Sequence, residues 1–155
     1  MKEGVFVNRV YEQHKSSVFD TDANIVSLSV YLIPLLGNFM TLGIISWVFP
    51  LVLLFVEKKS PLVYFHAVQS LVMQVVVTVF SIVSFAMTVI SAGSSFLLGF
   101  NIFGAIGAAG IFSLISLVIN GIMIAFEVVG IIKAYGWEAY YLPLFGTIVQ
   151  KFTKE

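Results

Sequence analysis

Three long apolar stretches, separated by short polar segments, constrain the fold of this chain more than any other feature. They cover residues 23–56, 62–92 and 96–134. A helix that crosses the hydrocarbon core of a bilayer needs about 20 apolar residues, and each stretch is longer than that. Hydrophobic residues make up 59% of the 155-residue chain and charged residues 10%, whereas a soluble domain has about 45–50% and about 25%. The sequence therefore predicts an all-α integral membrane protein.

A break divides the first stretch. Pro34 removes a backbone donor, and Gly37 and Asn38 loosen the helix shortly after it. We expect a short helix over 23–36, a turn, and a second helix over 39–56; one long broken helix over 23–56 is the alternative.

The second and third stretches predict helices over 62–92 and 103–135. Residues 23–135 would then form a compact bundle of about four transmembrane or membrane-embedded helices.

The positive charges near the helix ends predict the orientation. Lys58 and Lys59 follow the first stretch, and Lys133, Lys151 and Lys154 lie at or beyond the end of the third, while the serine- and glycine-rich loop between the second and third stretches carries no charge. Because positive loops stay on the cytoplasmic side, we expect both termini to be cytoplasmic. The expected location is the bacterial cytoplasmic membrane, with multiple passes through the lipid bilayer.

The two ends of the chain are more polar than its middle. Residues 1–22 form a polar arm, in which Val7, Val10, Tyr11 and Val18 would share one helical face and could lie on the membrane surface. A solvated flexible tail is the equal alternative. Residues 136–155 are too short to span, so an interfacial C-terminal tail is expected.

Polar residues follow one face of the second stretch. On a helix at 100° per residue, the following residues fall within about 140°: His66, Gln69, Ser70, Gln74, Ser81, Ser84, Thr88 and Ser91. On the last stretch, Ser113, Asn120 and Glu127 are spaced by seven and share a face. Polar groups are costly in hydrocarbon, so these faces should turn toward protein or trapped water.

These faces predict an intramembrane polar cluster of His66, Gln69, Gln74, Asn120 and Glu127. Glu127 lies about 12 Å inward of Tyr135 along the helix, where a carboxyl group must be paired, protonated or hydrated. We hypothesise that His66 and Glu127 face each other. Three interpretations stay open: a structural pair that fixes helix register, a site for an ion, proton or substrate, and an unrelated arrangement with His66 at the headgroups.

A run of small residues opens the last helix. Gly104, Gly107 and Gly110 lie in the sequence GAIGAAG, and small residues allow helix backbones to approach closely in a bilayer. Helix packing inside the monomer is the favoured interpretation, and dimerisation is the alternative.

Several kinds of chemistry lack their sequence signals. The chain has no cysteine and no HExxH, GxSxG or GxxxxGK[ST] motif, and His14 and His66 are far apart. We therefore expect no metal site, no cofactor and no enzymatic activity. The net charge of zero gives no basic surface for nucleic acid.

Two segments resemble a known family. They are PLVLLFVEKKSPLVYFHAVQSL, Pro50 to Leu71, and KAYGWEAYYLPL, Lys133 to Leu144. Over residues 25–152 the chain resembles a group of small bacterial membrane proteins. These are grouped with the twenty-kilodalton channel subunit of the chloroplast inner-envelope import translocon. The pair His66-x-x-Gln69 is among the most specific parts of this resemblance. This Tic-twenty-like resemblance implies a four-helix membrane bundle. The longer N-terminal arm and the serine-rich outer loop depart from the pattern.

Three functions follow as hypotheses. The first is a non-enzymatic integral membrane protein, an accessory or channel-like subunit in protein translocation, as the resemblance implies. The second is a small-solute or ion transporter or channel, indicated by the polar stripe and Glu127. The third is a membrane regulator or immunity protein. A membrane-protein partner would favour the first or third hypothesis, and a homo-oligomer the second.

Overall fold

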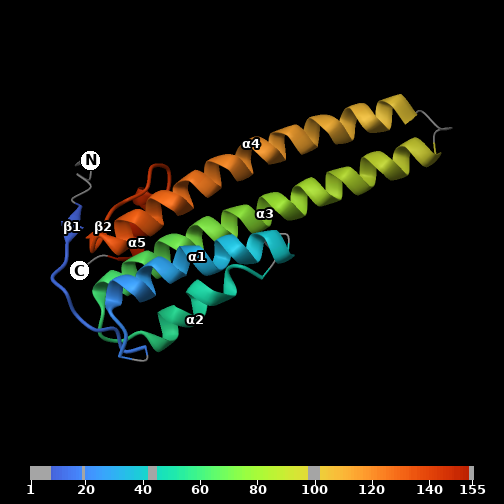
Figure 1. Cartoon of the computed structure of the whole chain (residues 1–155). Helices are drawn as coiled ribbons and strands as arrows, with labels where there is room; N and C mark the ends of the chain where they lie inside the picture. The colour runs from blue at the N-terminus through green and yellow to red at the C-terminus, as the bar shows by residue number, and fades with distance from the viewer. Residues whose placement is uncertain (1–7, 19, 42–44, 98–101, 154–155) are drawn as a thin grey trace.

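The computed structural model describes residues 8–18, 20–41, 45–97 and 102–153 (Figure 1). In this part of the chain the fold is helical, with one small two-stranded sheet. The elements in chain order are β1 Arg9–Val10, α1 Ala23–Thr41, α2 Val48–Val56, α3 Pro61–Leu97, α4 Ile102–Tyr135, β2 Glu138–Ala139 and α5 Gly146–Phe152.

Helices α3 and α4 form a long hairpin that dominates the molecule (Figure 1). They contain 37 and 34 residues, so at 1.5 Å per residue they are about 56 and about 51 Å long. Residues Pro61–Ser94 and Gly110–Tyr135 are long and apolar enough to cross a membrane. In their most apolar windows, only 6% and 17% of the residues are buried. The apolar side chains of this hairpin therefore face outward, as they do in helices surrounded by lipid.

Helix α1 corrects the predicted break in the first apolar stretch. It continues through Pro34, Gly37 and Asn38 to Thr41, so the turn expected at residues 37–38 is wrong, and α2 begins at Val48 instead of residue 39. Pro34 cannot donate to the Val30 carbonyl, four residues earlier.

The Ser70 hydroxyl of α3 donates to this carbonyl instead, with Oγ 2.8 Å from the Val30 oxygen. A proline is tolerated in a membrane helix when a neighbouring side chain satisfies the freed group. This contact from α3 explains why α1 does not end at Pro34.

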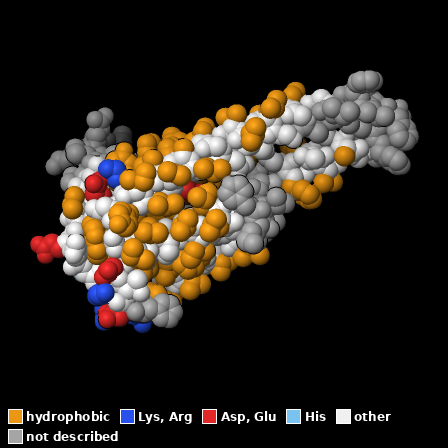
Figure 2. Space-filling model, in the orientation of Figure 1, with side chains coloured by type: hydrophobic (Ala, Val, Ile, Leu, Met, Phe, Trp, Pro, Cys, Tyr) orange, Lys and Arg blue, Asp and Glu red, His pale blue; other side chains and the backbone are white. Residues whose placement is uncertain are grey.

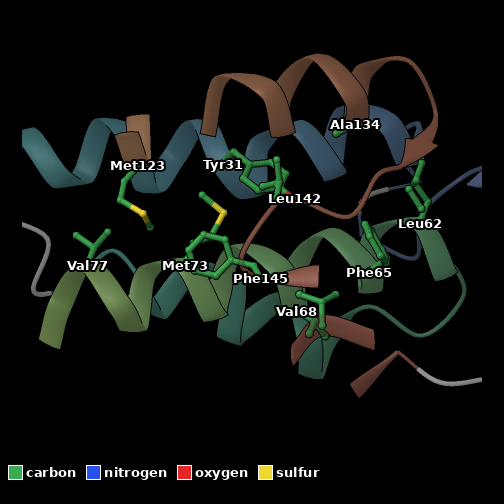
Figure 3. Packing of buried hydrophobic residues seen from close by; sticks show 12 residues of the cluster. Tyr31, Leu62, Phe65, Val68, Met73, Val77, Met123, Ala134, Leu142 and Phe145 are labelled. Carbon is green, nitrogen blue, oxygen red and sulfur yellow. The ribbon is translucent and has the colours of Figure 1, made fainter. Parts of the chain in front are cut away.

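The apolar core lies where α1, α3, α4 and the C-terminal segment meet. Tyr31, Met73, Met123 and Phe145 are among its buried members (Figure 3). Helix α4 approaches α1 most closely at Gly130, where an added Cβ atom would lie 2.8 Å from the Tyr31 ring.

Over its described residues, 8–18 and 20–22, the polar N-terminal arm forms a short strand and an isolated bridge instead of the expected helical face. Val7 of that face lies outside the described residues. Arg9 pairs with Ala139 and Val10 with Glu138 in an antiparallel arrangement, and the Tyr11 amide donates to the Trp137 carbonyl at 2.9 Å. The described N-terminal and C-terminal segments therefore lie at the same end of the bundle (Figure 1).

Charged side chains gather at this end of the molecule, whereas hydrophobic side chains cover its flanks (Figure 2). Helix α5 packs against α3 at this same end. We call it the charged end below.

Candidate functional site

The residues of the predicted polar cluster occupy different places in the structure. His66 and Gln69 bind the C-terminal segment, Gln74 binds Glu127, and Asn120 lies in a groove farther along the hairpin. The hypothesis that His66 faces Glu127 is wrong, because both ring nitrogens of His66 have other partners.

His66 and Gln69 belong to a buried hydrogen-bond network with Tyr31. The His66 Nδ1 atom lies 2.9 Å from the Tyr31 hydroxyl oxygen, and Nε2 lies 3.2 Å from the Glu138 carbonyl oxygen. With the proton on Nε2, His66 donates to this carbonyl and accepts from Tyr31. The Gln69 amide nitrogen then donates to the Tyr31 hydroxyl at 3.0 Å.

Gln69 also fixes the segment that follows β2. Its amide nitrogen donates to the Tyr140 carbonyl at 3.2 Å, and its carbonyl oxygen accepts from the Leu142 amide at 3.1 Å. Every polar group of His66 and Gln69 thus has a partner. We call this set the tail clamp, because it attaches residues 138–142 to α3.

Glu127 has a different environment and is the centre of the candidate site. It is 1% exposed, and its Oε1 atom accepts from the Gln74 amide at 2.5 Å and from the Asn38 amide at 3.4 Å. Gln74 comes from α3 and Asn38 from the last turns of α1, so three helices meet at this carboxyl group. The role of Asn38 was missed, because the sequence placed it in a turn.

The site around Glu127 contains polar atoms without partners. Glu127 Oε2, Gln74 Oε1 and Asn38 Oδ1 are buried and have no hydrogen-bond partner among the described residues. All three are acceptors when Glu127 is ionised. Leaving a buried polar group unsatisfied costs about 1–3 kcal/mol, so a donor or a cation bound beside Glu127 would relieve part of this cost.

A groove adjoins this site on the side of the hairpin. It has a volume of about 360 Å³ and is lined by Asn38, Val77, Phe80, Ser81, Ser84, Ser116 and Asn120. Asn38 belongs to both the groove and the Glu127 site, so it links the buried carboxyl group to the outside of the bundle. The Ser116 hydroxyl donates to Ser84 at 3.1 Å, and the exposed Asn120 donates to the Ser116 carbonyl of its own helix at 2.8 Å.

The small-residue run is less involved in packing than Gly130 is. Added Cβ atoms at Gly107 and Gly110 would meet nothing within 4 Å. The side-chain position of Gly104 lies outside the described residues. The packing role proposed for these three glycines stays a prediction, and the open space directs it toward another helix.

Glu57 follows α2 as its C-cap residue and binds the loop that precedes α3, outside the spanning segments, a role that the sequence analysis did not find. Burial raises the pKa of this carboxyl group, but hydrogen bonds from the Ser16 hydroxyl, the Lys59 amide, Ser17 and the Ser60 amide outweigh it and lower the pKa to about 2. The N-terminal arm is thereby attached to the loop between α2 and α3.

Two comparisons relate this chain to known proteins. Residues 22–149 match the magnetosome magnetite crystal formation protein family. The chain belongs to this family. It is also 27% identical to the UPF0132 membrane protein MJ1527 of Methanocaldococcus jannaschii. The aligned region has 139 residues and covers 83% of this chain and 84% of that relative. No solved structure matches the chain.

This membership overturns the resemblance to the translocon channel subunit, which was wrong. Neither the family nor the relative points to protein import. His66 and Gln69, which carried much of the resemblance, belong to the tail clamp and bind the backbone of Glu138, Tyr140 and Leu142. Such residues record how a tail is attached to a bundle and carry no information about activity.

Proposed function

We propose that this chain is a non-enzymatic, multi-pass membrane protein that binds and exchanges a small cation, a proton or a monovalent metal ion, at Glu127. The observation that carries the proposal is the set of unpartnered oxygen atoms of Glu127, Gln74 and Asn38. One carboxylate and two amide oxygens provide a single negative charge and hard oxygen ligands, which suit a small monovalent cation.

The position of Glu127 supports this proposal. It lies about 12 Å along α4 from Tyr135, within the span Gly110–Tyr135. An ionisable residue at such a depth is costly and is typically retained for ion or proton movement. The groove that begins at Asn38 and continues past Ser81 and Asn120 provides polar groups along a route between the site and the surface.

A bilayer placement with four membrane-embedded helices belongs to the proposal. The hairpin of α3 and α4 would cross the membrane. Helix α1, with 19 residues and about 28 Å of length, would reach almost through the core, with the short α2 returning beside it. The charged end, with Lys58 and Lys59, would be cytoplasmic, and both described ends of the chain lie there.

The description of the family agrees with an ion-handling role. It names the formation of magnetite crystals. Magnetite is an iron oxide, and its growth from aqueous iron releases protons, so a membrane site that takes up or passes cations would serve such a process.

A second candidate function is binding of another transmembrane helix, from a partner or a second copy. The exposed Asn120 and the open space at Gly107 and Gly110 favour it. Polar and small side chains at a lipid-facing surface are typical of helix contacts in membranes.

Flux through liposomes tests the cation site. Purified full-length protein is reconstituted with a pH-sensitive dye inside, and proton, sodium and potassium gradients are applied separately. Glu127→Gln keeps the size of the side chain and removes its charge, so we expect the flux of the bound cation to fall at least tenfold. Ser113→Ala, at an exposed polar position of the same helix outside the groove, should keep it. Equal flux in wild type and Glu127→Gln would refute the proposal.

A further inference from the structure

A second cavity lies at the charged end, and Glu127 is not among its lining residues. It has a volume of about 450 Å³ and is built by three separate parts of the chain: the arm near Arg9, the loop and helix start over residues 57–65, and the C-terminal segment with Tyr141 and Phe152. The tail clamp and the pairing of β1 with β2 hold these parts together.

The charges of this cavity are unbalanced. Arg9, Lys58 and Lys59 line it, and Glu57 is the one acidic residue in its described lining. The Glu57 carboxylate is 5% exposed and is already bound by Ser16, Ser17 and the amides of Lys59 and Ser60. Lys58 and Lys59 form no ion pair with any described residue, whereas Lys15 and Lys133 each do. Lys58 and Lys59 therefore offer positive charge to a ligand in this cavity.

Aromatic side chains form another part of the cavity wall. Tyr64 is 41% exposed and Phe152 64% exposed, and both line the cavity beside the lysines. This wall leads to the start of α3 at Pro61, where the first spanning segment begins. Aromatic residues at such a position lie at the level of lipid headgroups.

From this combination we propose that the cavity binds the phosphate-bearing headgroup of an anionic phospholipid. The phosphate lies between Lys58 and Lys59, and the acyl chains run past Tyr64 and Phe152 into the bilayer. Anionic lipids are concentrated in the cytoplasmic leaflet and are attracted by about 1 kcal/mol per basic residue near the surface. This inference rests on the proposed membrane orientation and is independent of the cation site.

Lipid titration of the purified full-length protein tests the inference. The protein in a neutral detergent is titrated with phosphatidylglycerol, phosphatidylcholine or inorganic phosphate, and bound lipid is counted by native mass spectrometry, with the thermal unfolding midpoint as a second measurement. We expect saturable binding of one phosphatidylglycerol, and weaker binding as the salt concentration rises.

Charge-removing variants identify the site. Lys58→Gln and Lys59→Gln should each weaken phosphatidylglycerol binding about fivefold, and the double variant about 25-fold. The matched control is Lys151→Gln, an exposed lysine of α5 that does not line the cavity, and it should change binding less than twofold. All three lysines are exposed, so the variants should fold.

Three outcomes would overturn the inference. Equal binding of phosphatidylcholine would show that charge is not recognised. An equal loss in Lys151→Gln and Lys58→Gln would show unspecific attraction to the whole charged end. Inorganic phosphate binding as tightly as phosphatidylglycerol would assign the cavity to a soluble phosphate instead of a lipid. In each outcome, proton and cation flux through Glu127 would be unaffected, so the two proposals can fail separately.

Discussion

The contact between Ser70 and the Val30 carbonyl predicts a measurable coupling between Ser70 and Pro34. In the native chain, Pro34 cannot donate to this carbonyl, and the Ser70 hydroxyl does so at 2.8 Å. Ser70→Ala would leave the oxygen of a buried residue without a donor, because Val30 is 0% exposed. We expect Ser70→Ala to lower the free energy of unfolding by about 1 kcal/mol. This value lies between the average of about 0.6 kcal/mol for hydrogen bonds in membranes and the upper figure of about 3 kcal/mol for a buried unsatisfied group.

The same change should cost much less when residue 34 can donate. In Pro34→Ala, the new amide reaches Val30 as in an ordinary helix turn, so removing the Ser70 hydroxyl should then cost less than about 0.5 kcal/mol. The small cavity left by the proline ring occurs in both arms of the cycle and cancels out. The coupling energy should therefore be about 0.5–1 kcal/mol.

A double-mutant cycle measures this coupling. Unfolding of the four proteins is followed in mixed micelles of rising denaturing-detergent content. The control is Ser27→Ala, since Ser27 is fully buried on α1 but its hydroxyl has no hydrogen-bond partner among the described residues. This change should be neutral or slightly stabilising. Strictly additive losses in the cycle would refute the explanation of why α1 continues through Pro34.

Three further predictions concern Glu127, Gly130 and Glu57. Glu127→Gln should leave the thermal stability unchanged or raise it, because the new amide can donate to unpartnered oxygen atoms nearby. Glu127→Leu should lower the free energy of unfolding by about 1–3 kcal/mol. A large loss of stability in Glu127→Gln would contradict the assignment of Glu127 to a site with unpartnered acceptors. Gly130→Ala should destabilise by about 1–3 kcal/mol because its Cβ would meet the Tyr31 ring at 2.8 Å, while Gly121→Ala, which meets nothing within 4 Å, should be neutral or stabilising in the same unfolding assay. The pKa of Glu57 is lowered from 4.5 to about 2, so its contribution to the free energy of unfolding is present above about pH 4.5. This contribution, at most about 3 kcal/mol, is lost as the pH falls toward about 2. Glu57→Gln should remove this part of the pH dependence of stability, and an unchanged pH dependence would contradict the stabilising role of the hydrogen bonds to Glu57.

Composition and pattern predicted the helical class and the long apolar hairpin, because a bilayer places strict requirements on length and hydrophobicity. They failed where one residue depends on a distant partner. Pro34 was taken, with Gly37 and Asn38, as a break that ends the helix at residue 36, because proline cannot donate to the Val30 carbonyl; the donor, Ser70, comes from another helix.

The candidate site was predicted only in part, for a related reason. Periodicity places His66 and Gln74 on one face of α3, but it does not say that the N-terminal end of this face meets residues 138–142 while the next turns meet α4 and α1. The spacing of Asn120 and Glu127 by seven predicted a common inward face, but Asn120 is exposed whereas Glu127 is buried, and the partner Asn38 lies beyond the point at which the sequence ended α1.

The tail clamp also has a consequence for biogenesis. His66 and Gln69 are inserted early, but the backbone groups that they bind, from Glu138 to Leu142, are synthesised more than 70 residues later. Until the ribosome has released this stretch, Tyr31 is the one partner of the tail clamp that is already synthesised, and the remaining polar groups of His66 and Gln69 must be hydrated or shielded. Closure of the bundle by residues 138–142 is thus a late step of synthesis.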